Sequence, residues 1–475
     1  MKKIQNFING QYQEPVDGNY LDNYEPGTGK IYAQIPNSNE KDLDLAEASA
    51  TQAFEAWSKM AIDKRSKILH KLADLIEQNL DELALAESRD NGKPLTLARA
   101  VDIPRASTNF RFYASSIVNF SSASHIAEGF MVNYTRRAPI GIVGCISPWN
   151  LPLYLFSWKI APALAMGNCV IAKPSELTPM TAYMLGDLAN QAGLSPGVLN
   201  ILHGEGSGIG QAIVASEATK AISFTGGTAT GKVVGATAAQ QFKKVSLELG
   251  GKNPNIVFAD CDLDEAVKMS VKSSFTNQGE ICLCGSRILI EDDIYEDFKA
   301  RFLAETAKLK VGDPMEEASN LGALVSQNHL DKVDYYVKLA EEEGGTVLYG
   351  GKRLDREGYY YLPTVIEGLD ENCRTNQEEI FGPVVTLNKF SDEDEAISVA
   401  NSTRYGLSCT LWTTNLKRAH RVAHAIQSGI VWVNCWLLRD LRTPFGGMKD
   451  SGIGREGGEE ALRFFSEPQN ICIKL

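Results

Sequence analysis

From about residue 140 onward, short apolar runs alternate with stretches of helical periodicity. The runs are rich in β-branched residues, and helical patterns such as 180–192 and 208–215 follow several of them. This alternation predicts a parallel, doubly wound sheet, because each helix returns the chain so that the next strand starts in the same direction. The strands predicted in this first series are 140–146, 169–173, 198–202, 221–225, 244–248 and 255–258.

A second series of the same kind runs from residue 264 to about residue 452. A chain of 475 residues is longer than a single hydrophobic core usually supports, so two α/β domains are expected. Helical periodicity dominates residues 41–92, ahead of both series. The strands predicted in the second series lie near 287–290, 384–390, 408–413 and 430–434.

Two segments outside these series are β-like but too short to fold alone. Residues 122–137 precede the first series, and residues 464–475 close the chain. A two-stranded element needs support from other parts of a protein. We therefore expect the two segments to pair with each other or with another subunit, which makes a homo-oligomer a natural hypothesis.

The composition disfavours several classes of protein. A formal net charge of -12 and a pI near 5.2 argue against nucleic acid as a partner. The most apolar region, 140–173, is interrupted by Lys159, Pro162 and Asn168, so it predicts a buried core and not a membrane span. No signal peptide is visible, and nine cysteines, an odd number, argue against a disulfide framework. A soluble protein of the reducing cytoplasm is expected.

Three segments together offer the groups needed for acyl chemistry on a carbonyl carbon. Cys282, in NQGEICLCGSR, is a candidate nucleophile, and Glu248, in LELGGK, is a candidate base. Asn150, in PWN, carries an amide that can stabilise an oxyanion. Each segment alone is a weak indication, because a lone cysteine is most often a buried side chain. The three segments in this order predict a nucleophilic cysteine enzyme.

The segment FTGGTATGK at 224–232 follows a short apolar strand and precedes an alanine-rich helix. It nearly matches the phosphate loop of nucleotide triphosphatases, but Val233 stands where a hydroxyl residue would bind Mg²⁺. A triphosphatase is therefore disfavoured. Two interpretations remain open: a turn that receives a phosphate group at a helix N-terminus, and a plain strand-to-helix turn.

Two further segments are equally open to interpretation. KPSE at 173–176 ends a predicted strand, where ligands bind in doubly wound sheets. Glu176 would accept hydrogen bonds from both ribose hydroxyls and repel a 2′-phosphate; alternatively, Ser175 and Glu176 mark the start of a helix. The glycine-rich segment 204–210 lacks the spacing of the usual dinucleotide fingerprint and is interpreted as a flexible loop.

No metal site is predicted. Cys282 and Cys284 form a Cys-x-Cys pair without further ligands nearby. His420 and His424 lie four residues apart on a predicted helix, but no third ligand accompanies them. Buried cysteines and a solvated histidine pair are the expected states.

Taken together, these segments resemble the aldehyde dehydrogenase superfamily over essentially the whole chain. The matching segments are PWN at 148–150, KPSE at 173–176, FTGGT at 224–228, LELGGK at 247–252, NQGEICLCGSR at 277–287, EEIFGPV at 378–384 and PFGGMKDSGIGREGG at 444–458. The resemblance implies a Rossmann-like cofactor domain, a second α/β catalytic domain and a bridging β arm, in a homodimer or homotetramer. It assigns residues 1–118 and 138–249 to NAD binding, 250–460 to catalysis, and 119–137 with 461–475 to the arm.

The resemblance also implies a role for each matching residue. Cys282 attacks an aldehyde, Asn150 and the Cys282 N–H hold the oxyanion, hydride leaves to NAD, and Glu248 activates water that hydrolyses the thioester. Many relatives have Ser at position 227, so Gly227 leaves the phosphate contact to backbone groups. Glu176 favours NAD over NADP. The residues expected to bind NAD are Trp149, Lys173, Ser175, Glu176, Gly227, Thr228, Leu249, Glu379 and Phe381.

Within the superfamily, the chain is similar to the 2-hydroxymuconic and 2-aminomuconic semialdehyde dehydrogenases. Arg105 and Arg439 match the substrate-binding positions, where guanidinium groups suit a carboxylate remote from the aldehyde. The alternative is that both arginines form structural salt bridges. No residue in the sequence indicates whether the substrate carries a hydroxyl or an amino group at carbon 2. The similarity is carried by DIPR at 102–105, NFRF at 109–112, EICLC at 280–284 and NCWLLRD at 434–440.

The expected function is therefore NAD-dependent oxidation of an unsaturated semialdehyde that carries a carboxylate. Three alternatives stay open: a broad-range or betaine-type aldehyde dehydrogenase, a reductase of acyl phosphates or thioesters, and a catalytically silent binding protein on this fold. Glu248 supports hydrolysis and so disfavours the reductase. A catalytically silent protein is disfavoured because the three candidate catalytic residues, Cys282, Glu248 and Asn150, are all present.

Overall fold

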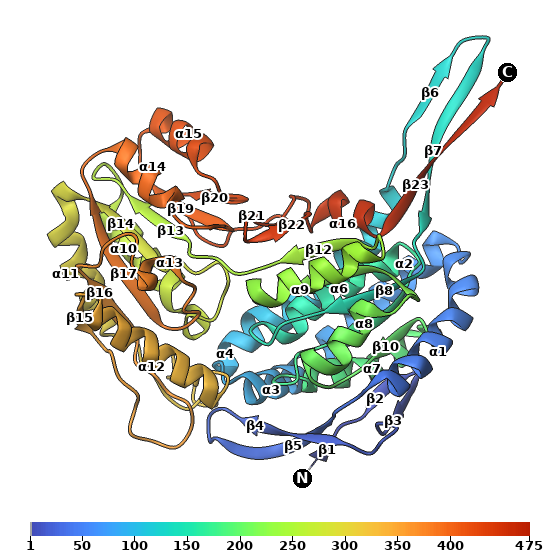
Figure 1. Cartoon of the computed structure of the whole chain (residues 1–475), viewed down its shortest axis with the longest axis horizontal. Coiled ribbons are helices and arrows are strands. Elements are labelled where there is room, and N and C mark those ends of the chain that lie inside the picture. The colour runs from blue at the N-terminus through green and yellow to red at the C-terminus, as the bar shows by residue number, and fades with distance from the viewer. Residues whose placement is uncertain (1) are drawn as a thin grey trace.

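Two sheets with helices packed against them form the body of the molecule, and a narrow β arm projects from it (Figure 1). This computed structural model describes residues 2–475. Helices alternate with strands in both halves, and most strands in the two large sheets are parallel. The predicted α/β class with two large sheets is confirmed.

The first sheet has eight strands, which are, in spatial order, β22 (Gly452–Ile453), β12 (Lys244–Glu248), β11 (Thr219–Thr225), β8 (Ile142–Ile146), β9 (Cys169–Lys173), β10 (Leu199–Ile201), β2 (Asn6–Ile8) and β3 (Gln11–Gln13). The strands from β12 to β10 are parallel, and β22 and β2 extend them antiparallel at either end. The chain order reverses between β8 and β11, because β9 and β10 lie on one side of β8 while β11 and β12 lie on the other. Doubly wound sheets bind ligands at such a reversal.

Helix α6 (Pro152–Ala165) is the most deeply buried helix against this sheet. All of its residues are buried, which its almost wholly apolar sequence requires. It starts directly after the PWN segment, so that segment is held between β8 and a rigid helix. The other helices of this half are α1 (Glu40–Ser58), α2 (Ile62–Gln78), α3 (Leu80–Asn91), α4 (Leu95–Leu97), α5 (Ile103–Ser116), α7 (Met180–Ala192), α8 (Gln211–Ala215) and α9 (Thr228–Gln240).

Two short stretches of this half wind as π-helix. One, Ala98–Asp102, leads into α5, and the other, Gly206–Gly210, leads into α8. The helix predicted at 208–215 is therefore α-helical only from residue 211. Three glycines in the second stretch explain the difference, since glycine weakens the α-helical preference.

The second sheet contains, in spatial order, β15 (Thr346–Tyr349), β16 (Thr364–Glu367), β17 (Val384–Phe390), β14 (Arg287–Glu291), β13 (Pro254–Val257), β19 (Ser408–Trp412) and β20 (Ile430–Val433). Only β15 runs antiparallel to its neighbour. The strand predicted at 255–258 was placed in the first series, but it is β13 of the second sheet. The chain crosses from the first sheet to the second in the short connection 249–253, between β12 and β13. The helices of this half are α10 (Leu263–Phe275), α11 (Tyr295–Thr306), α12 (Gln327–Glu342), α13 (Arg374–Gln377), α14 (Glu393–Asn401) and α15 (Leu416–Ala425).

The projecting arm joins two segments that are far apart in the sequence. Its strands are β6 (Ser124–Ala127), β7 (Met131–Pro139) and β23 (Ser466–Lys474), in the order β23-β7-β6. Strands β7 and β23 pair antiparallel along their whole length, from Ser466 opposite Pro139 to Lys474 opposite Met131. The two β-like segments of the sequence thus pair with each other.

The hydrophobic core is divided between the two sheets. One large cluster of buried residues, including Val143, Leu164 and Ile222, packs the first sheet against its helices. Smaller clusters, including one with Ile288 and Phe298, fill the second half. No helix in residues 2–475 is both long enough and apolar enough to cross a membrane. The remaining elements are β1 (Lys2–Lys3), β4 (Tyr20–Glu25), β5 (Lys30–Pro36), β18 (Tyr405–Gly406), β21 (Met448–Lys449) and α16 (Gly458–Phe464).

Candidate active site

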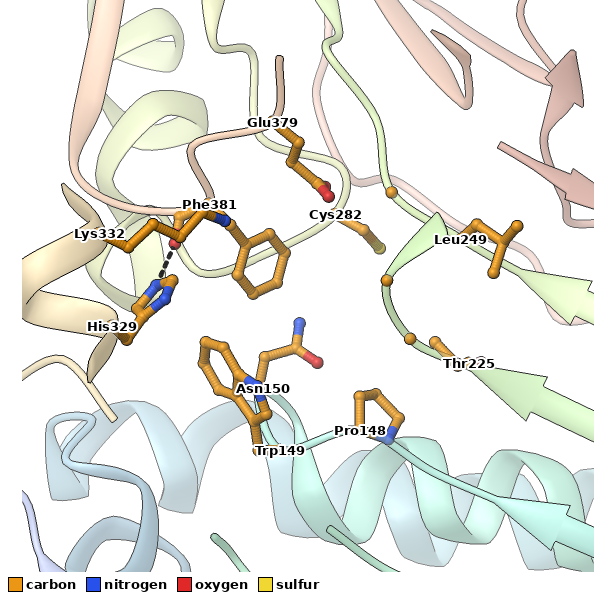
Figure 2. Close-up of a pocket in the computed structure, with 13 residues that line it drawn as sticks. Pro148, Trp149, Asn150, Thr225, Leu249, Cys282, His329, Lys332, Glu379 and Phe381 are labelled. Carbon is orange, nitrogen blue, oxygen red and sulfur yellow. Dashed lines mark hydrogen bonds between the residues drawn. The ribbon is translucent and has the colours of Figure 1, made fainter. Parts of the chain in front are cut away.

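Two cavities meet at Cys282. Both are lined by Thr225, Leu249 and Cys282, so these residues form the wall that the cavities share. The first cavity lies at the carboxyl ends of β8 and β11, at the point where the strand order of the first sheet reverses. In Figure 2 the Cys282 thiol, the Asn150 amide and the Phe381 ring surround one open space. A ligand in either cavity would therefore reach the same sulfur atom.

The loop that carries Cys282 is tightly fixed. Asn253 donates from Nδ2 to the carbonyl oxygens of Cys282, at 2.7 Å, and Cys284, at 2.9 Å. Gly279, just before the cysteine, has φ of +71° and leaves no room for a side chain, because a Cβ there would lie 2.2 Å from the carbonyl oxygen of Gly382. The backbone around the nucleophile is thus set by contacts rather than by a regular element.

Burial raises the pKa of the Cys282 thiol, and the carboxylates of Glu379 and Glu248 raise it further. Arg439 acts in the opposite direction but more weakly. The thiol is therefore protonated at neutral pH, and a base must take its proton before it can act as a nucleophile.

Asn150 is placed to stabilise negative charge beside the thiol. Its Nδ2 donates one hydrogen bond, of 2.9 Å, to the carbonyl oxygen of Glu280, which leaves the second amide hydrogen free. The backbone carbonyl oxygen of Asn150 accepts hydrogen bonds from Lys93 Nζ, at 3.0 Å, and from Asn277 Nδ2, at 3.1 Å. Among the backbone hydrogen bonds of turns and loops in residues 2–475, none has the Cys282 N–H as its donor. Two donors thus remain for an oxyanion.

Glu248 ends β12 and lines the second cavity together with Cys282. Both of its carboxylate oxygens are buried and have no hydrogen-bond partner. Burial raises the pKa of this carboxyl well above its usual range, and the Glu456 carboxylate adds to the rise. A buried carboxylate without partners and with a raised pKa is suited to accept a proton from a thiol or from water.

Glu456, which the sequence analysis did not identify, lies beside this base. It accepts a hydrogen bond of 2.8 Å from Lys159 Nζ, which is fully buried, and one of 3.1 Å from the Ser223 hydroxyl. These bonds hold the Glu456 carboxylate close to Glu248, while Glu248 itself forms no salt bridge with a cation in residues 2–475. In the sequence, Glu456 is marked only by its position in the glycine-rich segment 444–458, which gives no indication that its side chain lies beside Glu248.

The far wall of the first cavity comes from residues 379–381 and from α12. Glu379 accepts a hydrogen bond of 2.9 Å from the Gly251 N–H, and a Cβ on Gly250 would collide with its carboxylate. The Trp149 and Phe381 rings meet edge to face, with centroids 5.2 Å apart (Figure 2). An aromatic wall and a carboxylate held by one backbone amide can receive a nicotinamide and its ribose.

Two residues of α12 complete this wall and were missed by the sequence analysis. His329 donates from Nε2 to the carbonyl oxygen of Phe381 at 2.6 Å, and burial lowers the pKa of its imidazole to about 4, so it is neutral. Lys332 lines the cavity near Glu379, and burial lowers the pKa of its amine. Neither residue lies in a glycine-rich or charged motif that would have marked it.

The remaining predicted cofactor residues lie along the same edge of the first sheet. Lys173, at the end of β9, donates from Nζ to Glu176 Oε2 at 3.0 Å, and the Ser175 hydroxyl accepts from the Leu177 N–H. The hydroxyl of Thr228, the first residue of α9, is buried without a partner. No atom lies within 4 Å of the position of a Cβ on Gly227.

These features fit a dinucleotide. The open space at Gly227 and the unpartnered Thr228 hydroxyl lie at the N-terminus of α9, where a phosphate group is favoured. The Lys173–Glu176 pair offers a donor and an acceptor for ribose hydroxyls. Lys173, Ser175, Glu176 and Thr228 do not line the cavity around Cys282 itself, as expected if they hold the other end of a long cofactor.

Arg439 lines the second cavity, and Arg105 lies next to it. Arg439 donates from Nη1 to the Tyr154 hydroxyl at 3.1 Å and lies over the Phe445 ring, 4.0 Å from its centroid. Arg105 lies over the Tyr154 ring, donates to Asn109 Oδ1, and has a buried Nη2 without a partner. Burial lowers the pKa of Arg105, and the charge of Arg439 adds to this effect.

Two neighbouring guanidinium groups without a counter-ion indicate an anion site. In residues 2–475 no carboxylate forms a salt bridge with Arg105 or Arg439, so the alternative that both arginines are structural salt bridges is not supported. Burying cations without an anion is costly. A carboxylate on the ligand of the second cavity would remove that cost. The remainder of this cavity is largely apolar, with Leu97, Val101, Leu151, Leu155 and Trp436 in its lining.

No group of three or more His, Cys, Asp or Glu side chains in residues 2–475 is arranged to hold a metal ion. All nine cysteines are free, and Cys284 is buried. The His420 and His424 rings lie 6.2 Å apart between centroids on α15.

Comparisons with known proteins agree with this geometry. The sequence profile of the Aldehyde dehydrogenase family matches residues 12–471. The chain is 49% identical to mouse 2-aminomuconic semialdehyde dehydrogenase, over 99% of this chain and 98% of that protein. It is 44% identical to 2-hydroxymuconic semialdehyde dehydrogenase from Pseudomonas sp. (strain CF600), over the full length of both. The NAD+ complex structure of aldehyde dehydrogenase from Bacillus cereus superposes with a TM-score of 0.98 at 38% identity, covering 100% of this chain and 97% of that one.

Proposed function

The chain belongs to the aldehyde dehydrogenase family, and we propose that it oxidises 2-hydroxymuconic or 2-aminomuconic 6-semialdehyde to the corresponding acid with NAD. The observation that carries the choice of substrate is the pair of guanidinium groups, Arg439 and Arg105, beside the cavity that contains Cys282 and Glu248. Semialdehydes of this class carry a carboxylate at the end remote from the aldehyde, and their conjugated chain fits between apolar walls. The names of the two muconic semialdehyde relatives support the same choice.

Oxidation begins with the Cys282 thiol. Glu248 accepts its proton, directly or through water, and the thiolate attacks the aldehyde carbon, so a C–S bond forms while the carbonyl π electrons move to oxygen. The free amide hydrogen of Asn150 and the Cys282 N–H donate to this oxyanion. When bound, NAD accepts the hydride that leaves the carbon as the thioester forms.

The residues that would hold NAD are distributed over the edge of the first sheet. Lys173, Ser175 and Glu176 would take the adenosine ribose, Gly227 and Thr228 the pyrophosphate, and Trp149, Leu249, Glu379 and Phe381 the nicotinamide end. Glu176 accepts ribose hydroxyls and repels a 2′-phosphate, which favours NAD over NADP. The NAD+ complex of the Bacillus cereus relative supports this assignment.

Glu248 also completes the reaction. Once Glu248 has released the thiol proton to solvent, it removes a proton from water, the resulting hydroxide adds to the thioester carbon, and the C–S bond breaks to give the carboxylic acid and the Cys282 thiolate. Because Glu248 lines the cavity beside Cys282, hydrolysis needs no external acyl acceptor. This placement disfavours a reductase of acyl phosphates or thioesters.

Formation of NADH, followed by absorbance, tests the proposed function. The assay compares freshly generated 2-hydroxymuconic semialdehyde with an uncharged aliphatic aldehyde, and uses Cys282→Ala as the control for enzyme-independent oxidation. We expect strong preference for the muconic substrate. Equal or better use of the aliphatic aldehyde would refute the substrate assignment and leave a broad-range aldehyde dehydrogenase.

We further propose a homodimer or homotetramer that works in the cytoplasm. The projecting arm supports assembly, because its long strands β7 and β23 lie outside the body and its outer side chains Ile126, Phe130 and Ile473 are exposed. The nine free cysteines support a reducing compartment. Sedimentation equilibrium at micromolar concentration tests the assembly; a monomer there would contradict it.

The division of the chain into domains stays a prediction, which limited proteolysis can test. The three predicted units are an NAD-binding domain of residues 1–118 and 138–249, a catalytic domain of residues 250–460, and an arm of residues 119–137 and 461–475.

A further inference from the structure

We propose that Lys272, at the rim of the second cavity, is a specificity-determining residue that attracts carboxylate-bearing aldehydes toward Arg439. This inference rests on the proposed function and extends it from the inside of the cavity to its entrance. It concerns a residue outside the motifs that carry the family resemblance.

Lys272 belongs to the last turn of α10, the helix that leads to the Cys282 loop. It lines the same cavity as Arg439 and Cys282, yet its side chain is exposed to solvent. Its carbonyl oxygen accepts a hydrogen bond of 2.7 Å from the Thr276 hydroxyl, and Thr276 also lines the cavity. A residue that is both exposed and part of the lining marks the place where the cavity meets solvent.

The charge of Lys272 is not neutralised within the part of the chain that the structure describes. No salt bridge involves it there, whereas Asp264, the acid at the start of the same helix, pairs with Arg301 at 2.6 Å. The ammonium group is therefore free to act on an approaching anion. Lys272 and the half-buried Arg439 together place positive charge at the rim and inside the cavity.

An anionic substrate needs such a local cation. The protein carries a formal net charge of -12, so its average field repels a carboxylate at long range. Fields at physiological salt decay over roughly 8–10 Å, so a single cation at the entrance can dominate the potential that a substrate meets there. The same charge would have little effect on an aldehyde without a carboxylate.

The rim position gives this role a signature that a solvated lysine without function would lack. Charges at the rim of a site change association and its dependence on salt, whereas partners inside the site change retention of the ligand. Lys268 provides the matched control, because it lies one helical turn earlier on α10, is exposed, and does not line the cavity. Lys268→Glu makes the same change in net charge as Lys272→Glu.

The experiment measures kcat/KM of wild type, Lys272→Glu, Lys268→Glu and Arg439→Ala at low salt and at roughly 0.3 M salt. Each enzyme is assayed with 2-hydroxymuconic semialdehyde and with an uncharged aldehyde, and its thermal unfolding is recorded. At low salt we expect Lys272→Glu to lower kcat/KM for the muconic substrate about 3- to 10-fold, and Lys268→Glu to lower it less than about 2-fold. The loss in Lys272→Glu should shrink at high salt and be absent with the uncharged aldehyde.

Two other results would overturn the inference, and they differ in what else they overturn. If wild type prefers the muconic substrate and Arg439→Ala loses that preference, but Lys272→Glu behaves like Lys268→Glu, only the role of Lys272 is wrong. A loss that is equal for both aldehydes or independent of salt has the same meaning. If wild type shows no preference for the muconic substrate, the proposed substrate and the role of Lys272 are both wrong.

Discussion

The two cavities that meet at Cys282 are built in different ways. Much of the first cavity is lined by segments at or just after strand ends, such as 148–150 after β8 and 225–227 at the end of β11. The second cavity takes much of its lining from separate helices and loops, with Val101, Tyr154, Lys272 and Arg439 among the lining residues. The difference teaches that residues in recognisable local motifs supply much of the first lining, while side chains from separate elements supply much of the second.

The electrostatics of the two cavities also differ. Glu379 faces the first cavity and its carboxylate contacts the Gly251 N–H, so ribose hydroxyls find an acceptor there. The second cavity is lined by both Arg439 and Glu248, and the positive charge of Arg439 partly offsets the rise in the pKa of the Glu248 carboxyl. Under the proposed function, the Arg439 guanidinium attracts the carboxylate of the substrate, whereas the first cavity presents a carboxylate to its ligand.

The largest effect should come from the wall that the cavities share. Cys282→Ala should lower kcat by roughly 10⁴-fold or more for every aldehyde, because no other thiol lines either cavity in the described residues 2–475. Binding of NAD, measured by fluorescence quenching, should change little, since the thiol is not a cofactor ligand. Substantial oxidation by this variant would show that Cys282 does not form the thioester.

Glu248→Gln separates the base from the rest of the second cavity. We expect kcat to fall roughly 10²- to 10³-fold, because the amide cannot accept a proton. In wild type the pKa of Glu248 is raised, so its protonated form persists to higher pH and kcat should fall as the pH drops through that pKa. The kcat profile of the variant should lose this acidic limb. An unchanged limb would assign it to another group.

Arg439→Ala tests whether the second cavity selects by charge. Loss of a charged contact inside a site costs about 2–4 kcal/mol, so KM for a muconic semialdehyde should rise roughly 30- to 1,000-fold. The uncharged aldehyde should show little change. Arg442→Ala is the control, because Arg442 is exposed, pairs with Asp440 at 2.5 Å and does not line the cavity. Equal losses on both aldehydes would indicate a structural role for Arg439.

The smallest effect is expected in the first cavity. Glu176→Ser should lower the preference for NAD over NADP about 10-fold, because it removes both the ribose acceptor and the repulsion of a 2′-phosphate. Kinetics with the two cofactors measure this ratio. The choice between the two aldehydes should stay as in wild type, and a change there would show that the two cavities are coupled.

The sequence predicted the parts of this molecule that depend on local patterns. Strands such as Cys169–Lys173 and Lys244–Glu248 lie where apolar runs predicted them, because the first is buried throughout and the second is buried over its last three residues. Non-local pairings could not be predicted. The placement of 255–258 in the first series was wrong because periodicity does not say to which sheet a strand belongs.

The same distinction holds for the candidate site. Cys282, Glu248 and Asn150 lie in segments with a recognisable pattern. In the structure Asn150 lines the first cavity, Glu248 lines the second, and Cys282 lines both. The residues His329 and Lys332 lie on an ordinary amphipathic helix, and their role depends on where that helix packs. A side chain that reaches a site from a remote element leaves no local signal.

The short strand β22 has a consequence for how the enzyme is made. It belongs by sequence to the second half of the chain, yet it pairs with Leu247 and Glu248 at the edge of the first sheet. A growing chain that has not reached residue 452 therefore leaves β12 as an open edge with its base unsupported, and open edges invite pairing with other chains. A chimaera that combines the two halves of different relatives therefore needs β22 and β12 to come from the same parent.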